Sequence, residues 1–145
     1  MGYGLLRCHG RQLTVVDSGT IVVTRGQDLS QRLGLLLQGF EAMIERHQPD
    51  EVAVEDVFTA RNARSALTLG QARGVVLAVA GRRGLPLFAY APATVKRAVS
   101  GYGRADKQQM QHMVQVLLCM LRLPAPDEAD ALAVAICHAL HPRVT

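Results

Sequence analysis

The hydrophobic pattern alternates between short apolar runs and longer amphipathic stretches, which is typical of an α/β protein. The first part predicts a hairpin: a strand over residues 2–7, a turn at 8–11 and a second strand over residues 13–24, with a bulge near residues 17–19. Apolar residues at helical spacing then follow Asp28 and predict a helix that runs to about His47.

The next apolar run, Glu-Val-Ala-Val-Glu-Asp-Val-Phe at residues 51–58, follows a break at Pro49. Helix, break and apolar run together predict a buried parallel strand that ends at Glu55. Open α/β sheets bind their ligands just outside the carboxyl ends of their strands, so Glu55 is a candidate functional residue. The alternative is an acidic side chain at a solvated strand end.

Turn and cap residues divide the remainder of the chain. Asn62 is placed to cap a helix over residues 63–82, which is rich in glycine and alanine and ends before Gly84. The small residues favour close packing, either within one subunit or on a second subunit. A strand at 85–90, a short helix after Pro92, a loop at 101–104, a helix at 106–121 and a last helix at 127–140 complete the expectation.

Length and composition are those of one globular domain spanning residues 1–145, with 49% hydrophobic residues. No apolar run is long enough to span a membrane, and no signal peptide is recognisable. The three cysteines lack metal-ligand spacing, and Cys119 and Cys137 fall in apolar helical patterns. Cys119 and Cys137 are therefore expected to be buried, reduced thiols. Reduced thiols and the lack of a membrane span predict a cytoplasmic protein that is not attached to a membrane.

Basic residues concentrate in the middle of the chain. Residues 59–107 contain nine lysines and arginines against one acid, a net charge of +8, while the rest contains seven basic and eleven acidic residues, a net charge of −4. Cations beside a group of carboxylates would suit an enzyme that binds a phosphate backbone. Solvated helix faces are the alternative explanation.

A second acidic group lies near the C-terminus, in Asp127-Glu128-Ala129-Asp130. Asp127 and Asp130 are three residues apart, so on a helix they share a face, and Glu128 points elsewhere. Together with Glu55 they form a ligand set suited to Mg²⁺ or Mn²⁺. The alternative is capping, with Asp127 as the N-cap of the helix and Asp130 favoured by the helix dipole.

Three segments resemble the RuvC family of bacterial Holliday-junction resolvases: residues 55–62, residues 66–74 and residues 127–133. The resemblance extends over residues 2–140. It implies an RNase H-like fold, in which a mixed sheet is flanked by helices. It also implies a metal-dependent homodimer that resolves four-way DNA junctions by paired symmetric nicks during homologous recombination and DNA repair.

The same resemblance assigns roles to individual residues. Glu55, Asp127 and Asp130 match three of the family's four acidic metal ligands, in a site that holds two ions of Mg²⁺ or Mn²⁺. Phe58 matches an aromatic residue that stacks on bases at the junction centre. Lys96 and Lys107 match residues that hold the DNA backbone, and Arg61 is grouped with these DNA contacts. A branch-migration helicase complex is a further implied partner.

The family pattern begins with a strand that carries Gly-Ile-Asp-Pro-Gly, and its aspartate is the fourth ligand. Here Met1 directly precedes Gly2-Tyr3-Gly4, so that central strand and its aspartate are expected to be missing from an N-terminally truncated domain. Two hypotheses follow. One is that the protein is an active nuclease and this sequence starts at the wrong methionine or is a fragment. The other is a non-catalytic remnant that binds junctions or only dimerises.

Overall fold

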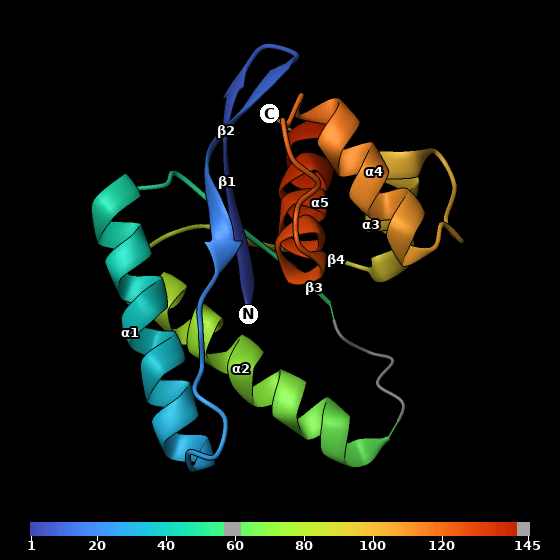
Figure 1. The fold of residues 1–145 in the computed structure, drawn as a ribbon. Helices are drawn as coiled ribbons and strands as arrows, with labels where there is room; N and C mark the ends of the chain where they lie inside the picture. The colour runs from blue at the N-terminus through green and yellow to red at the C-terminus, as the bar shows by residue number, and fades with distance from the viewer. Residues whose placement is uncertain (57–61, 142–145) are drawn as a thin grey trace. The chain divides into compact units, whose positions relative to one another are not determined.

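The structure is a computed structural model that describes residues 1–56 and 62–141. The chain divides into two compact units. Their residue ranges can be followed by the colour bar of Figure 1. The first unit consists of Met1 and residues 21–89, and the second consists of residues 2–20 and residues 90–145. The prediction of a single domain over residues 1–145 stays a prediction.

The first unit contains α1 (Leu29–His47), β3 (Val52–Glu55), α2 (Ala63–Arg82) and β4 (Leu87–Tyr90), although Tyr90 itself counts with the second unit. α1 and α2 pack together, and β3 pairs with β4 in a two-stranded sheet. Both helices begin and end close to the predicted positions. Asn62 Oδ1 accepts a hydrogen bond from the Ser65 N–H at 2.9 Å, which confirms the predicted cap.

The core of the first unit forms where α1 and α2 face each other. Its buried members are Phe40, Ile44, Val76 and Val79, and partly buried residues of β3 and β4 pack against them. Val52, Ala53 and Val54 are only half-buried, so the prediction of a fully buried strand is wrong. β3 has one hydrogen-bonded neighbour among the described strands, and a strand paired on one side keeps part of its surface exposed.

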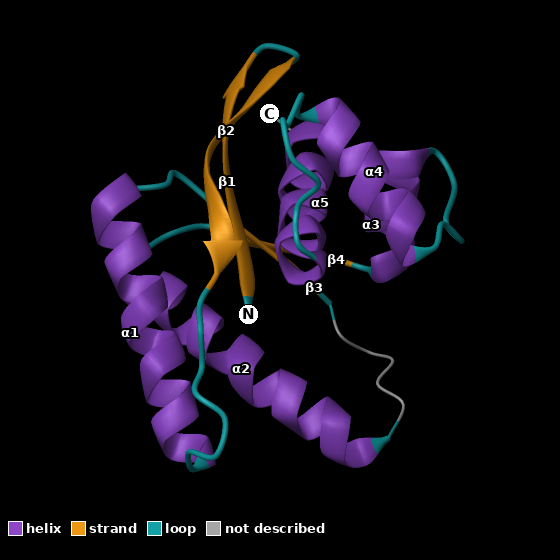
Figure 2. Ribbon diagram, in the orientation of Figure 1, coloured by secondary structure: helices purple, strands orange, loops and turns teal. Residues whose placement is uncertain are grey.

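The second unit is built around α5 (Pro126–Leu140), which packs on the hairpin of β1 (Gly2–His9) and β2 (Gln12–Thr20). α3 (Pro92–Ser100) and α4 (Lys107–Leu117) cover α5 as well. The hairpin is antiparallel, and its register shifts between Leu5 and Leu6, opposite Asp17 and Val15. Val16 is therefore the extra residue of a bulge close to the predicted position. Figure 2 shows the hairpin in orange and α5 in purple.

Two glycines let β1 approach α5 at backbone distance. A Cβ atom at Gly2 would overlap the Asp127 carbonyl oxygen, and one at Gly4 would lie 2.6 Å from Leu132 Cδ2. Leu132 is fully buried and cannot move away. The sequence Gly2-Tyr3-Gly4 therefore sets how closely α5 packs on the strand.

Three details differ from the sequence-based expectation. α4 ends at Leu117 rather than near residue 121, because Cys119 adopts a left-handed backbone conformation with φ of 50°. Cys119 is exposed, whereas Cys137 is buried as predicted. The strands pair as two two-stranded sheets, β1 with β2 and β3 with β4.

No helix in the described part of the chain is long and apolar enough to cross a membrane.

The packing of β1 on α5 gives a first prediction. Gly4→Ala should lower the free energy of unfolding by about 1–3 kcal/mol, the usual range for an extra group in a filled core. Chemical denaturation measures this change. The control is Gly34→Ala on α1, where a Cβ meets nothing within 4 Å. It should raise the free energy of unfolding by roughly 0.5–1 kcal/mol, since alanine replaces a helical glycine. Equal stability of the two variants would contradict the packing argument.

Candidate active site

The first turn of α5 brings two of the predicted acidic ligands together. Ala125 is the N-cap, Pro126 is the first helical residue, and Asp127 and Asp130 follow on the same turn. Both residues keep part of their surface exposed. Partial burial of its carboxyl raises the pKa of Asp130 above its usual value, and the nearby Asp127 charge adds to the rise. The two carboxylates therefore share one site, in which their charges repel each other.

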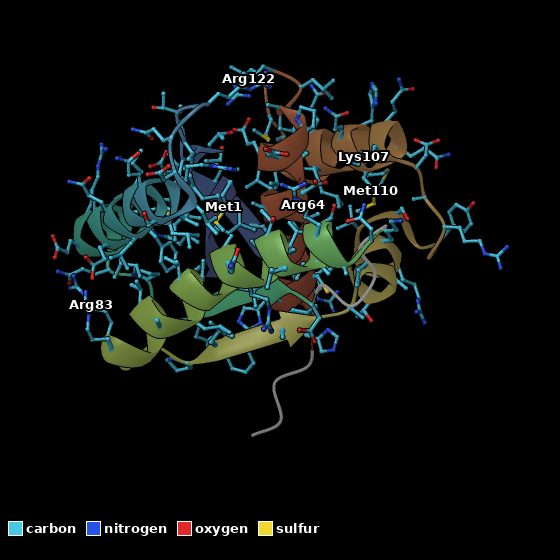
Figure 3. The ribbon with its side chains drawn as sticks, turned by 90° about the horizontal axis from the view of Figure 1, so that it is seen from below. Met1, Arg64, Arg83, Lys107, Met110 and Arg122 are labelled. Carbon is cyan, nitrogen blue, oxygen red and sulfur yellow. The ribbon has the colours of Figure 1, made fainter. Side chains whose placement is uncertain are left out.

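Two lysines predicted to bind DNA act on the same carboxylate. Lys107 and Lys96 both lower the pKa of Asp130, and Lys107 has the larger effect of the two. Lys107 is the first residue of α4, and Met110 lies one turn further along that helix (Figure 3). Lys96 lies in α3. Three helices of the second unit thus contribute charges to the surroundings of Asp130.

Asp127 is not the N-cap of α5, so that part of the capping alternative is wrong. The helix begins one residue earlier than predicted, and Ala125 at the N-cap has no side chain that could accept a hydrogen bond. The backbone N–H of Ala125 instead donates to Glu128 Oε2 at 3.0 Å. Glu128 is the third helical residue, the position from which a glutamate reaches back to the helix start. Asp127 stands in the first turn, where the helix dipole favours an acidic side chain, but it does not cap the helix.

Glu128 is buried, with 2% of its surface exposed. Arg122 donates to it twice, from Nη1 to Oε2 at 2.8 Å and from Nη2 to Oε1 at 2.7 Å. Ser18 Oγ donates to Oε1 at 2.6 Å. The hydrogen bonds from Arg122 are the largest cause that lowers the pKa of Glu128 to about 2, with Ser18 and the Ala125 N–H adding to it against the effect of burial.

Glu55 ends β3 in the first unit and is exposed. The next residue, Asp56, accepts a hydrogen bond from Arg73 of α2 at 2.8 Å, which ties the end of the strand to that helix. Among residues 1–56 and 62–141, no group of three or more acidic, histidine or cysteine side chains could hold a metal ion. Phe58 and Arg61 lie outside the described residues. Of the predicted site residues, Asp127, Asp130, Lys96 and Lys107 lie in one unit.

The basic middle of the chain is less available for DNA than its net charge indicates. Arg73 pairs with Asp56, Arg82 with Glu41, and Arg83 with Glu45, all inside the first unit. The other described members of the basic segment are Arg64, Lys96, Arg97, Arg104 and Lys107. Four of these five lie between α3 and the start of α4, so the cationic character of the segment concentrates in the second unit.

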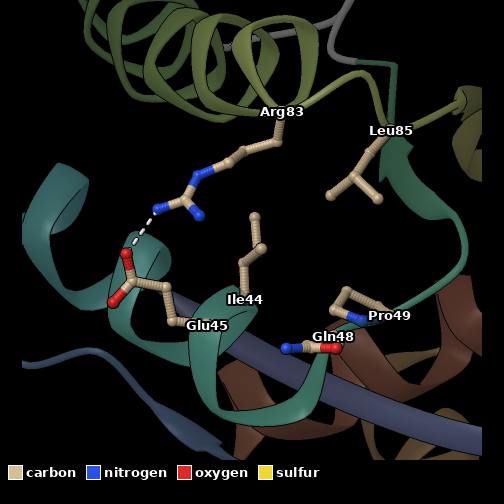
Figure 4. Close-up of a pocket in the computed structure, with 6 residues that line it drawn as sticks. All are labelled: Ile44, Glu45, Gln48, Pro49, Arg83 and Leu85. Atoms are coloured by element: carbon tan, nitrogen blue, oxygen red, sulfur yellow. Dashed lines mark hydrogen bonds and ion pairs between the residues drawn. The ribbon is translucent and has the colours of Figure 1, made fainter.

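A hollow of about 460 Å³ in the first unit is not the predicted site. Figure 4 shows its lining by Ile44, Glu45, Gln48, Pro49, Arg83 and Leu85. Gln48, Pro49 and Leu85 precede β3 and β4, so the hollow lies at the amino ends of these strands, whereas Glu55 lies at a carboxyl end. Its charged groups, Glu45 and Arg83, pair with each other at 2.6 Å.

Comparison with known proteins identifies the family. The family model of crossover junction endodeoxyribonuclease RuvC matches residues 1–138. The chain belongs to the RuvC family. It is 49% identical to the RuvC of Chloroflexus aggregans over 140 residues, which cover 96% of this chain and 85% of the relative. The RuvC of Desulfitobacterium hafniense is 50% identical over 140 residues, with the same coverage.

Solved structures agree with this assignment. Thermus thermophilus RuvC in complex with Holliday junction substrate has a TM-score of 0.87 at 31% identity, covering 95% of this chain and 85% of that one. A second Thermus thermophilus RuvC structure has a TM-score of 0.83 at 32% identity, covering 95% of this chain and 86% of that one. The RNase H-like α/β fold and the endodeoxyribonuclease class expected from the sequence are confirmed.

The partners of Glu128 differ in how far the sequence indicates them. A proline at the first helical position followed by a glutamate at the third is a recognisable helix-start signal, so the contact with Ala125 could have been predicted. Arg122 is six residues away, in the loop before α5. Ser18 is 110 residues away, and no local pattern connects it to the helix.

Glu128 should make stability depend on pH. Its pKa in the folded chain, about 2, lies below the ordinary value of 4.5, so its stabilising effect is complete above pH 4.5. Between pH 4.5 and about 2 the unfolded chain binds a proton that the folded chain does not, and the effect is lost. At pH 7 we expect Glu128→Gln to lower the free energy of unfolding by about 2 kcal/mol, a figure that allows for the exposure of Arg122 to solvent.

Urea denaturation of both proteins at pH 7 and near pH 3 measures this effect. The difference in unfolding free energy between wild type and Glu128→Gln should be smaller at the lower pH. A difference that is the same at both pH values would show that the carboxylate charge of Glu128 does not stabilise the fold.

Proposed function

We propose that the chain binds four-way DNA junctions and resolves them by paired symmetric nicks that depend on a divalent metal ion. The observation that carries the proposal is the first turn of α5, where two adjacent carboxylates lie within the influence of two lysines. The relative solved with a Holliday junction supports the choice of substrate. The same activity places the protein in homologous recombination and DNA repair.

The donor set fits a hard divalent cation. Asp127 and Asp130 offer carboxylate oxygens, the ligands that Mg²⁺ and Mn²⁺ prefer. Within the described residues neither side chain is hydrogen-bonded or ion-paired, in contrast to Glu128. In the proposal Glu55 joins them as a third ligand. When two metal ions are bound, they supply an activated water and stabilise the leaving oxygen of the phosphodiester.

The surrounding side chains position the DNA and control the charge at the site. Lys96 and Lys107 attract the phosphate backbone, and by lowering the pKa of Asp130 they favour its ionised, metal-binding form. We assign Arg61 to the same backbone contacts. Phe58 is assigned to stacking on bases at the opened centre of the junction, an interaction worth roughly 1–3 kcal/mol per base.

A homodimer would supply the two active sites that paired nicks require, and its two-fold symmetry would match that of the junction. α2 is the proposed contact, because residues 62–70 are exposed throughout. Leu67 and Leu69 are 62% and 46% exposed, and a Cβ at Gly70 or Gly74 would meet nothing within 4 Å. The proposal keeps a branch-migration helicase complex as a further partner.

The proposed roles separate cleavage from binding. Asp127→Asn, Asp130→Asn or Glu55→Gln should abolish nicking of a labelled four-way junction in Mg²⁺, since each removes a metal ligand. Junction binding should persist, because these side chains are not assigned to DNA contacts. Lys107→Ala should instead weaken binding to every junction sequence. It should also reduce the slope of the logarithm of the binding constant against the logarithm of salt concentration by about one. Gel-shift and cleavage assays on the same preparations measure both effects.

The unmodified chain decides between nuclease and binding protein. Paired nicks that require Mg²⁺ or Mn²⁺ would support the proposed function. Tight binding of the junction without nicks at any metal concentration would support the non-catalytic alternative. Unimpaired nicking by both Asp127→Asn and Asp130→Asn would show that the first turn of α5 is not the metal site.

Light scattering tests the homodimer. At tens of micromolar the chain should have twice the monomer mass, and Leu67→Glu should reduce it to the monomer, because a charge would be buried in the contact. The matched control is Leu121→Glu in the loop after α4, another exposed leucine, which should leave the mass unchanged. A monomeric unmodified chain would contradict the proposed contact.

A further inference from the structure

We propose that Glu128 is a positioning residue, which fixes the first turn of α5 so that Asp127 and Asp130 present their carboxylates together to the metal. This inference rests on the proposed function of those two aspartates. Glu128 lies between them in sequence but is the buried charged residue among the described side chains, with 2% of its surface exposed. Burial of a charge is costly unless every acceptor position is used.

The contacts of Glu128 fill those positions. An ionised carboxylate has about four sites that accept hydrogen bonds. Here two come from Arg122, at 2.8 and 2.7 Å, one from Ser18 at 2.6 Å, and one from the Ala125 N–H at 3.0 Å. A carboxylate with this set of donors has no lone pair left for a metal ion. Glu128 is therefore not a metal ligand, although both of its acidic neighbours are proposed to be.

The donors belong to three different parts of the second unit. Ser18 lies in β2 and Ala125 at the start of the helix. Arg122, which Figure 3 labels, lies in the loop between α4 and α5. The bond from Ala125 closes the start of the helix itself, and those from Ser18 and Arg122 tie the turn to two other segments, so the turn cannot rotate about its axis or slide along it without breaking a charge-assisted hydrogen bond. Asp127 and Asp130 belong to that turn, so their positions are fixed by the same contacts.

A second constraint acts on the same turn. The Asp127 carbonyl oxygen lies directly against Gly2 of β1, where no side chain fits. If the Glu128 contacts were lost, the turn could move away from the hairpin but not towards it. Metal affinity is sensitive to such movements, and loss of an outer partner of the ligands typically costs 10–100-fold.

The alternative is an ion pair that only stabilises the fold. Loss of it would lower the melting temperature and leave metal binding unchanged at temperatures where the protein is folded. A measurement of metal affinity well below the melting temperature therefore distinguishes a positioning role from a merely structural one.

The experiment measures the dissociation constant of Mn²⁺ by titration calorimetry on the full chain, without DNA. Glu128→Gln keeps the side-chain shape and removes the charge pair, and it should raise the dissociation constant about tenfold or more. Arg122→Gln acts on the same contact from the loop and should have a similar effect. Glu45→Gln is the matched control, since it removes the ion pair with Arg83 in the first unit and should leave Mn²⁺ binding unchanged.

A double variant gives the sharpest readout. Because Glu128 acts through both aspartates, Glu128→Gln should weaken Mn²⁺ binding by a smaller factor in the Asp130→Asn background than in the unmodified chain. Ser18→Ala, which removes a single hydrogen bond, gives a milder variant if Glu128→Gln does not fold, and it should raise the dissociation constant several-fold.

The outcomes separate this inference from the proposed function. A lowered melting temperature with an unchanged Mn²⁺ dissociation constant in Glu128→Gln, Arg122→Gln and Ser18→Ala would overturn the positioning role and leave the metal site standing. Absence of Mn²⁺ binding to the unmodified chain, or binding that Asp127→Asn and Asp130→Asn do not weaken, would overturn both.

Discussion

The backbone of β1 lies so close to the start of α5 that only a hydrogen atom fits at the side-chain position of Gly2. Gly4 repeats the contact against the fully buried Leu132. At these two positions the hairpin supports the helix through its backbone, with no side chain of β1 between them. Protein interiors of this density transmit displacements rather than absorb them. The geometry of the turn that carries Asp127 and Asp130 follows from this contact.

The first turn of α5 contains one carboxylate whose charge stabilises the folded chain, Glu128, and one whose charge destabilises it, Asp130. Glu128 has its pKa lowered to about 2 by its hydrogen bonds, whereas partial burial raises the pKa of Asp130. The first effect means that the folded chain favours the charge at residue 128, and the second that it disfavours the charge at residue 130. Proteins accept such a local cost mainly at functional sites. The contacts of Glu128 thus hold together a turn in which the aspartates repel each other.

The sequence predicted the order and type of the helices and strands well, because hydrophobic period, caps and turn residues are local signals. The helix after Asp28 and the cap at Asn62 are examples. Errors occurred where tertiary context decides. Cys119 is exposed because α4 ends early, and the carboxylate that caps α5 is Glu128 rather than Asp127. The acidic pair was found because a spacing of three residues places two side chains on one helix face. Ser18, 110 residues from Glu128, gave no such signal.

The net charge counted from the sequence also fails to show which cations are available to DNA. The net charge of +8 over residues 59–107 counts every basic side chain. DNA is attracted only by those cations that are not already neutralised by nearby acids. Arg73, Arg82 and Arg83 pair with acids in the first unit. Lys96 and Lys107 lie close enough to Asp130 to lower its pKa. One set of charges can thus attract the phosphate backbone and keep a metal ligand ionised. When a phosphate binds to Lys96 or Lys107, it screens them from Asp130, and the positive charge of the metal ion would then have to keep that carboxylate ionised.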